Sequence, residues 1–242
     1  MTYLIVLAAG LLPALLLLSF IYKQDPIPEP WSQLKRAFIY GVLISFPASA
    51  FEGVLSYGIF GIGDQVSSVF EAAIESFFVA ALVEEGLKLA ALWWLLRRNP
   101  HFDEHFDGIV YAVFISLGFA AIENVLYLFT NINDWLSVGI ARAFLAVPGH
   151  YAFAVIMGYY YAMYYFVERS TYNRVMILLG PILAHGIYDT IAFSASLSAE
   201  LSGVCMCLLV FFCYRLHKFS HRKLLSHVDR DTHPFQDIEK NM

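Results

Sequence analysis

Two carboxylates and one ammonium stand side by side in the otherwise apolar sequence LVEEGLKLAAL at residues 82–92. At helical spacing, Lys88 lies four residues after Glu84 and three after Glu85, so its ammonium projects between the two carboxylates. Glu85 precedes the basic residue Arg97 by 12 positions. That separation is roughly 18 Å along a helix, which is near the middle of a bilayer. An ionised side chain costs on the order of 3 kcal/mol at that depth, so these residues require mutual pairing or a water-filled cavity.

Three later apolar stretches also carry groups that could do chemistry. Glu123 and Asn124 stand in the sequence FAAIENVLY, and His150 stands in PGH at the start of another apolar stretch. His185 and Asp189 are four residues apart in HGIYD and therefore share one helix face. At this spacing an acid orients an imidazole, or joins it in binding a third group.

Each motif alone has a simpler explanation: an interhelical salt bridge, a polar pair between helices, or a residue at a helix start. Together, four helices bring ionisable groups to overlapping depths in a chain with only 14% charged residues. Such convergence is improbable as packing alone. The sequence therefore predicts an active or transport site formed by Glu84, Glu85, Lys88, Glu123, His150, His185 and Asp189.

The elements that must position these groups are membrane helices. The chain has 242 residues, of which 59% are hydrophobic, and a net charge of −5 without a basic stripe. This composition excludes a nucleic-acid partner and indicates a polytopic, all-α helix bundle in a lipid bilayer. The expected spans are 3–21, 37–60, 69–96, 107–130, 149–167, 175–194 and 201–216.

One apolar run, about 135–147, is too short to cross a bilayer. Its neighbours place both of its ends on the outer side, so we expect a re-entrant or interfacial helix on which Arg142 faces protein or water. The alternative is an eighth span, with one loop that breaks the positive-inside rule. Lys and Arg cluster in the loops that this rule places inside, so the N-terminus is expected outside and the C-terminus in the cytoplasm.

The chain is expected to form one transmembrane domain, residues 1–217, followed by a mobile, polar cytoplasmic tail, residues 218–242. The three cysteines fall in the last apolar run without a CxxC pair, which is typical of packed thiols.

The candidate residues favour hydrolysis by an activated water, because no serine or cysteine stands at a recognisable nucleophile elbow. Two histidines and a carboxylate can hold a hydrolytic zinc ion, with a further glutamate as general base. In a metal-free version, a glutamate deprotonates the water and the histidines stabilise the oxyanion. Both versions cleave a peptide bond, and the sequence leaves the choice open.

Four blocks, EEGLK, FAAIENVLY, PGH and HGIYD, resemble in order the EExxK, FxxxExxxY, PGH and HxxxD motifs of the PrsW family of bacterial intramembrane proteases. The resemblance implies a multi-pass protease of the bacterial cell membrane. It also implies a single-span substrate, an anti-sigma factor, cleaved on its outer side in a site-1 type step. The related CAAX-protease and bacteriocin superfamily has histidine where this chain has Glu123, which weakens transfer of its metal-free mechanism.

On this resemblance, Glu84 or Glu85 is expected to activate the water, while Lys88 holds the other carboxylate in its charged form. A second set of residues would bind zinc or, without it, polarise the scissile carbonyl: Glu123, His150 and His185. Asp189 would orient His185. Arg142 and Asn124 are the candidates for binding substrate.

Two other functions use the same residues. An ion- or proton-coupled transporter would relay protons through the buried carboxylates and histidines, although the sequence lacks an inverted repeat. A binding or immunity protein with a degenerate site would tolerate Glu84→Gln or His185→Ala, whereas a protease would lose activity.

Overall fold

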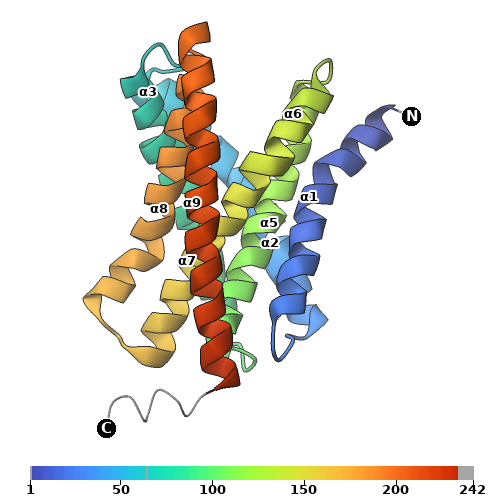
Figure 1. Ribbon diagram of the computed structural model, residues 1–242, viewed down its shortest axis with the longest axis vertical. Coiled ribbons are helices and arrows are strands. Elements are labelled where there is room, and N and C mark those ends of the chain that lie inside the picture. Colours follow the sequence, from blue (N-terminus) through green and yellow to red (C-terminus); the bar gives the residue numbers. More distant parts are fainter. Residues whose placement is uncertain (1, 64, 234–242) are drawn as a thin grey trace.

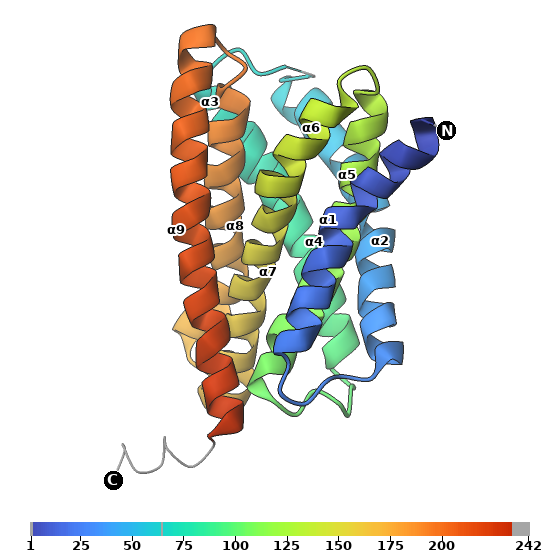
Figure 2. The same cartoon turned by 45° about the vertical axis from the view of Figure 1, so that its right-hand side comes forward.

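In the computed structural model, which describes residues 2–63 and 65–233, the chain forms a bundle of long helices that run roughly side by side (Figure 1). Helix α1 begins at one end of the bundle and α9 ends at the other (Figure 2). The elements are α1 (Thr2–Gln24), α2 (Trp31–Gly53), η1 (Val54–Phe60), α3 (Val69–Ile74), η2 (Glu75–Ala81), α4 (Leu82–Leu96), α5 (His105–Thr130), α6 (Trp135–Ala141), η3 (Arg142–Ala146), α7 (Val147–Ala162), η4 (Met163–Val167), α8 (Thr171–Ser194) and α9 (Ala199–Thr232), where η marks π-helical turns.

Seven helices are long enough to match the predicted spans when the π-helical turns are joined to their neighbours. Six of these are also apolar enough to cross a membrane over the residues that the structure describes. The seventh, residues 69–96, contains the charged EEGLK block, which lowers its hydropathy. The chain is therefore a multi-pass, all-α membrane protein, as the sequence predicts.

The run at about 135–147 is not a separate re-entrant helix, and that prediction is corrected. It forms the first part of one continuous helix, Trp135–Val167, of 33 residues. Pro148 suggested a helix start, because proline cannot donate a backbone hydrogen bond. The π-helical turns of η3 immediately precede it and widen the helix, which lets the chain continue past the proline.

Helix α9 is also longer than expected, because it continues from the membrane span to Thr232. Residues 218–232 are thus helical and do not form the mobile extension expected from their polar composition. The carboxylate of Asp231 fixes this end by accepting hydrogen bonds from the backbone N–H groups of His105 and Phe106, at 3.0 and 2.8 Å. The remainder of the predicted tail, 234–242, lies outside the described residues.

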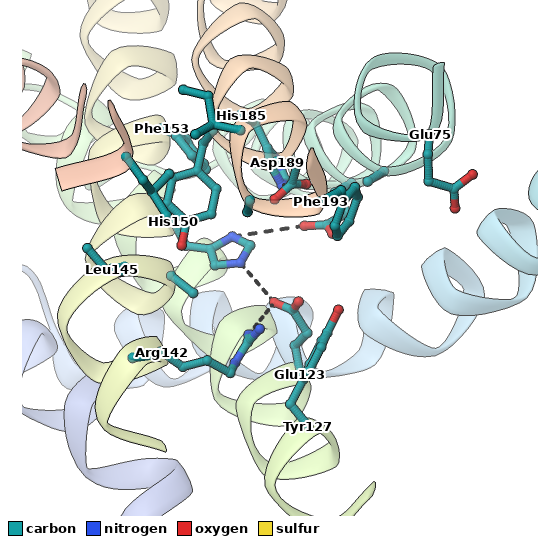
Figure 3. A pocket seen from close by; sticks show the side chains of 18 of the residues that line it. Glu75, Glu123, Tyr127, Arg142, Leu145, His150, Phe153, His185, Asp189 and Phe193 are labelled. Carbon is teal, nitrogen blue, oxygen red and sulfur yellow. Dashed lines mark hydrogen bonds and ion pairs between the residues drawn. The ribbon is translucent and has the colours of Figure 1, made fainter. Parts of the chain in front are cut away.

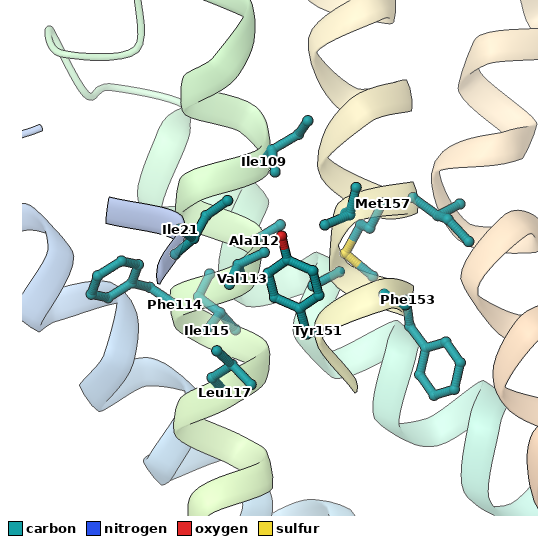
Figure 4. Packing of buried hydrophobic residues seen from close by; sticks show 14 of the residues in the cluster. Ile21, Ile109, Ala112, Val113, Phe114, Ile115, Leu117, Tyr151, Phe153 and Met157 are labelled. Carbon is teal, nitrogen blue, oxygen red and sulfur yellow. The ribbon is translucent and has the colours of Figure 1, made fainter. Parts of the chain in front are cut away.

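Helix α5 is the centre of the bundle and packs against α1, α2 and α7. Its residues from Phe106 to Ala121 are all buried, and Figure 4 shows its aliphatic side chains facing Tyr151 and Met157 of α7. Lipid tails are as apolar as these side chains, so close van der Waals contact stabilises the association more than removal from water does.

Glycines allow the backbones of these helices to touch. A Cβ atom at Gly41 of α2 would lie 1.9 Å from the carbonyl oxygen of Ile115, and one at Gly158 of α7 would lie 2.3 Å from that of Gly108. Neither position can accept a larger side chain without separating the helices. The close contacts therefore fix α5 in depth and rotation, which positions Glu123 further along the same helix.

Candidate active site

The EEGLK block forms a buried ion cluster on α4. The ammonium nitrogen Nζ of Lys88 lies 2.8 Å from Glu84 Oε2 and 2.8 Å from Glu85 Oε1. The same nitrogen lies 3.2 Å from His150 Nδ1 on α7. All four residues are buried. The contacts predicted from the helical spacing are present, and the lysine also joins α4 to α7.

His185 of α8 lies between two carboxylates. Its Nδ1 is 3.1 Å from Glu85 Oε1 and its Nε2 is 3.0 Å from Asp189 Oδ2. Carboxylates only accept hydrogen bonds, so both ring nitrogens donate and the ring is an imidazolium in this arrangement. The ring stacks on Phe153 with a centroid distance of 4.8 Å. The contact between His185 and Asp189 that the spacing of the HGIYD block predicts is therefore present.

A close contact between α8 and η2 brings His185 to this position. A Cβ atom at Gly186 would lie 2.4 Å from the ring of Phe77, so only glycine fits there without a shift of that ring. The contact places α8 against the helix that continues into α4. The glycine next to His185 thus sets the distance between the imidazolium and Glu85.

His150 connects the cluster on α4 to α5. Its Nε2 lies 2.8 Å from Glu123 Oε2, as Figure 3 shows. An ammonium can only donate, so Nδ1 accepts from Lys88 and Nε2–H donates to Glu123, which makes the ring neutral. A neutral histidine and an imidazolium therefore lie next to each other, with 5.4 Å between the centroids of His150 and His185.

Arg142 supplies the cation that balances Glu123. Its Nη2 lies 3.2 Å from Glu123 Oε2, and its guanidinium lies over the ring of Tyr127 at 3.9 Å (Figure 3). Its Nε donates to Asn124 Oδ1 at 2.8 Å. Asn124 is fully buried and its Nδ2 donates to the carbonyl of Gly10 on α1. The polar atoms of Asn124 are thus engaged within the protein, where they hold Arg142.

These groups surround a cavity of about 460 Å³. The candidate residues that line it are Glu84, Glu123, Arg142, His150, His185 and Asp189. Glu85 and Lys88 do not line it, because they lie behind Glu84 at 0% and 2% exposure. The structure thus separates the two adjacent glutamates, which the sequence could not distinguish.

The cavity also has acidic residues that the sequence argument did not include. Glu52 of α2 and Glu75 of η2 line it, and each has one buried carboxylate oxygen without a hydrogen-bond partner among the described residues. Both stand as single carboxylates within predicted spans, without a partner nearby in the sequence. Their depth in an apolar helix was the only signal that could have identified them.

The donor atoms of Glu84, Glu85 and His150 fit a hydrolytic metal ion, because one atom from each lies within 4.8 Å of the others. Two carboxylates and one imidazole leave a coordination position for water. Lys88 bonds to the same three side chains, so a metal at these atoms would require its ammonium to move away. The set expected from the sequence shares His150 with this group, and its other two members, Glu123 and His185, each lie next to His150.

Comparison with known proteins agrees with this geometry. Residues 29–215 match the sequence model of a family described as PrsW family intramembrane metalloprotease. The chain is 37% identical to Protease PrsW of Oceanobacillus iheyensis, over 91% of this chain and 99% of that protein. It is 39% identical to Protease PrsW of Geobacillus kaustophilus, over 76% and 77% of the two chains. It is 35% identical to Protease PrsW of Bacillus subtilis, over 79% of this chain and 84% of that protein. No solved structure matches the chain.

Proposed function

Because the chain belongs to the PrsW family of intramembrane metalloproteases, it is a membrane-embedded protease, and we propose that peptide-bond hydrolysis takes place in the cavity beside α4. One observation carries this proposal. The cavity wall combines the carboxylate of Glu84 with the imidazoles of His150 and His185 and the guanidinium of Arg142. A base, two polarising rings and an anion-binding group are the parts that hydrolysis by an activated water requires.

Glu84 is the proposed general base. It lines the cavity, whereas Glu85 is fully buried behind it. A carboxylate that removes a proton from water must reach that water directly or through one further molecule. Glu84 Oε2 also accepts a hydrogen bond from the ammonium of Lys88, which places a cation beside the proposed base. Of the two glutamates, Glu84 therefore activates the water and Glu85 positions Lys88 and His185.

Arg142 is the proposed group for binding the substrate carbonyl or a substrate carboxylate. It lines the cavity, and its Nη2 has an ion pair with Glu123 but no hydrogen bond of good geometry. A guanidinium has five N–H donors, so it can bind Glu123 and a substrate oxygen at once. Asn124 acts on the substrate through Arg142, because it accepts a hydrogen bond from Arg142 Nε.

In a form with a metal, the ion would be held by Glu84, Glu85 and His150 with Lys88 displaced, and it would supply a Lewis acid that makes water a stronger nucleophile at neutral pH. Glu84 would then be a ligand, so its role as general base belongs to the form without a metal. Zinc is the proposed ion, because it binds both imidazole nitrogens and carboxylate oxygens and this set offers both. A set of Glu123, His150 and His185 is the second possibility. In either case, Asp189 orients His185 and Arg142 balances the charge of Glu123.

The proposed substrate is a single-span membrane protein, such as an anti-sigma factor, cut in a site-1 type step. The cavity extends from Glu84 to Ala195 and Cys205, near the connection between α8 and α9. This connection lies at the end of the bundle where α1 begins (Figure 2). With the N-terminus outside and the C-terminus in the cytoplasm of a bacterial cell, cleavage would take place toward the outer face.

The direct test uses the purified protein in proteoliposomes with a single-span peptide substrate. Wild type should cut the peptide near its outer boundary, and Glu84→Gln should lower the rate by about 10³-fold or more. Glu168→Gln, which removes an exposed carboxylate from the loop between η4 and α8, should cut at the wild-type rate. If Glu84→Gln retains wild-type activity, Glu84 is not the base.

A metal analysis separates the two forms of the mechanism. We expect about one equivalent of zinc in purified wild type and loss of that zinc in His150→Ala. Loss in His185→Ala, with retention in Glu85→Gln, would instead favour the set of Glu123, His150 and His185. If wild type contains no stoichiometric metal and chelators leave its activity unchanged, the carboxylate mechanism operates without an ion.

A further inference from the structure

A second group of carboxylates lies at the opposite end of α5 from Glu123. Glu29 belongs to the loop between α1 and α2, Asp103 to the loop before α5, and Asp107 to the first turn of α5. One oxygen atom from each lies within 4.8 Å of the others. The three residues thus join two loops and the central helix, although 74 residues separate Glu29 from Asp103.

Part of this group is explained by helix capping. Asp107 Oδ2 accepts hydrogen bonds from the backbone N–H groups of Asp103 and Glu104, at 3.0 and 2.8 Å. Together with Glu104 these bonds form a capping box at the start of α5. Capping uses only one oxygen of Asp107. The other, Oδ1, has no hydrogen-bond partner among the described residues, although the side chain is 0% exposed.

Two further observations indicate that a positive charge is missing here. Asp25 is only 7% exposed, and its Oδ2 is a second buried carboxylate oxygen that has no hydrogen-bond partner in the part of the chain that the structure describes. Glu29 is 6% exposed and accepts a hydrogen bond from Tyr111, but its carboxylate also lies against that of Asp107. Neighbouring carboxylates in a buried site require a shared proton or a cation between them.

We propose that Glu29, Asp103 and Asp107 bind a hard divalent cation, Mg²⁺ or Ca²⁺, which ties the loop between α1 and α2 to the start of α5. The donors are all carboxylate oxygens, which these two ions prefer, and the set has no histidine or cysteine that would select zinc. Asp103 is exposed, so the ion can enter from the aqueous side and keep some of its water ligands. This site is structural and separate from the cavity beside α4.

The test measures thermal unfolding of the full-length protein in detergent after treatment with a chelator, with and without added Mg²⁺ or Ca²⁺. An ion that binds only the folded state at concentrations far above its Kd should raise Tm by about 5 °C. Glu29→Gln and Asp103→Asn should each abolish most of this shift. Neither change removes the capping bonds that Asp107 makes, so both variants are expected to fold. Glu168→Gln removes a single exposed carboxylate and should keep the full shift.

The variant Glu84→Gln tests whether the ion binds at the active site instead. It should keep the full rise in Tm with Mg²⁺ or Ca²⁺, because Glu84 lies in the other cluster. A second readout is luminescence of bound Tb³⁺, which replaces Ca²⁺ at oxygen sites and is excited through a nearby tyrosine such as Tyr111. The proposal is wrong if wild type shows no shift, which would mean that Glu29 and Asp107 share a proton. It is also wrong if Glu29→Gln keeps the shift or if Glu84→Gln abolishes it.

Discussion

The two ends of α5 both carry carboxylates, but the protein balances their charge in different ways. In the cavity cluster, a cationic or imidazole partner contacts each of Glu84, Glu85, Glu123 and Asp189, and Lys88 bonds to two of them at 2.8 Å. At the other end, Glu29 and Asp107 lie against each other and are held by a tyrosine hydroxyl and backbone N–H groups. The first arrangement places cationic or imidazole groups beside these four acids. The second leaves negative charge that a proton or an ion must balance.

This difference matches what each region has to do. A general base must be ionised before it can take a proton, so the lysine beside Glu84 suits the role proposed for that residue. Acids that only join loops can remain partly protonated or bind an ion from the aqueous phase. Removing one charge should therefore have opposite effects on stability in the two regions.

Lys88→Met should have the largest effect. It leaves Glu84 and Glu85 buried without their cation, which costs about 3–5 kcal/mol of unfolding free energy. Cleavage should fall to background, because the proposed base Glu84 then loses the ammonium that holds it in place. Thermal unfolding in detergent and the proteoliposome assay measure the two effects. Lys35→Met removes an exposed lysine of α2 and is the matched control.

If Lys88→Met unfolds at the wild-type temperature, the two ends of α5 do not balance their charges differently. The double variant Glu84→Gln with Lys88→Met should recover part of the lost stability, since it removes one of the two unpaired carboxylates. A double variant no more stable than Lys88→Met would mean that lost packing, and not charge, destabilises the protein.

The EEGLK block illustrates how much a sequence can determine about such a site. Helical spacing alone places Lys88 between the two glutamates, and the structure shows both contacts. Spacing cannot determine the rotation of a helix against its neighbours. Glu84 faces the cavity and Glu85 faces His185 because α4 follows the π-helical turns of η2 and packs against α8. The roles of the two residues therefore could not be separated in advance.

The convergence of His150, His185 and Glu123 was predictable from their depth in separate helices. The continuity of the helix Trp135–Val167 was not predictable. Pro148 normally marks a helix start, and the π-helical turns of η3 that let the helix continue past it are visible only in the structure. Arg142, the charge partner of Glu123, lies on that helix. The ion pair between them therefore could not be predicted without knowing that the helix is continuous. Local rules thus predicted which polar groups come together, while the helix packing determined their partners.

Gly186→Ala should have the next largest effect. Its Cβ atom would lie 2.4 Å from the Phe77 ring and should destabilise the protein by about 1–3 kcal/mol. Displacement of the neighbouring His185 from Glu85 should also lower the cleavage rate by about tenfold. Gly86→Ala is the matched control, because nothing lies within 4 Å of its added Cβ atom. Equal effects of the two substitutions would mean that helix propensity, and not the contact with η2, controls this position.

Glu29→Gln should have a smaller effect of opposite sign to that of Lys88→Met. In divalent-free buffer it should stabilise the protein by about 1 kcal/mol, because it removes one of two carboxylates in contact and leaves an oxygen to accept from Tyr111. Burial raises the pKa of Glu29, which agrees with a cost of charging it. Thermal unfolding in chelator measures the change. If Glu29→Gln is destabilised as strongly as Lys88→Met, the two regions do not differ in the way described.

Asp25→Asn should have the smallest effect, seen as a change in pH dependence. Burial and the nearby charge of Glu29 raise the pKa of Asp25 from 3.8 to about 6 in the folded protein. The folded state then binds more protons than the unfolded state between these values, so the stability contributed by Asp25 falls as pH rises from about 4 to 6.

The measurement is the difference in Tm between wild type and Asp25→Asn at pH 4 and pH 7, in divalent-free buffer. Asparagine keeps the hydrogen bond from the backbone N–H of Ile27, so the variant differs mainly in charge. It should gain stability relative to wild type as pH rises, and added Mg²⁺ should reduce that gain, because the ion offsets the charge of Glu29. A difference in Tm that is the same at both pH values would show that Asp25 ionises normally, and that the charge at this end of α5 is already balanced.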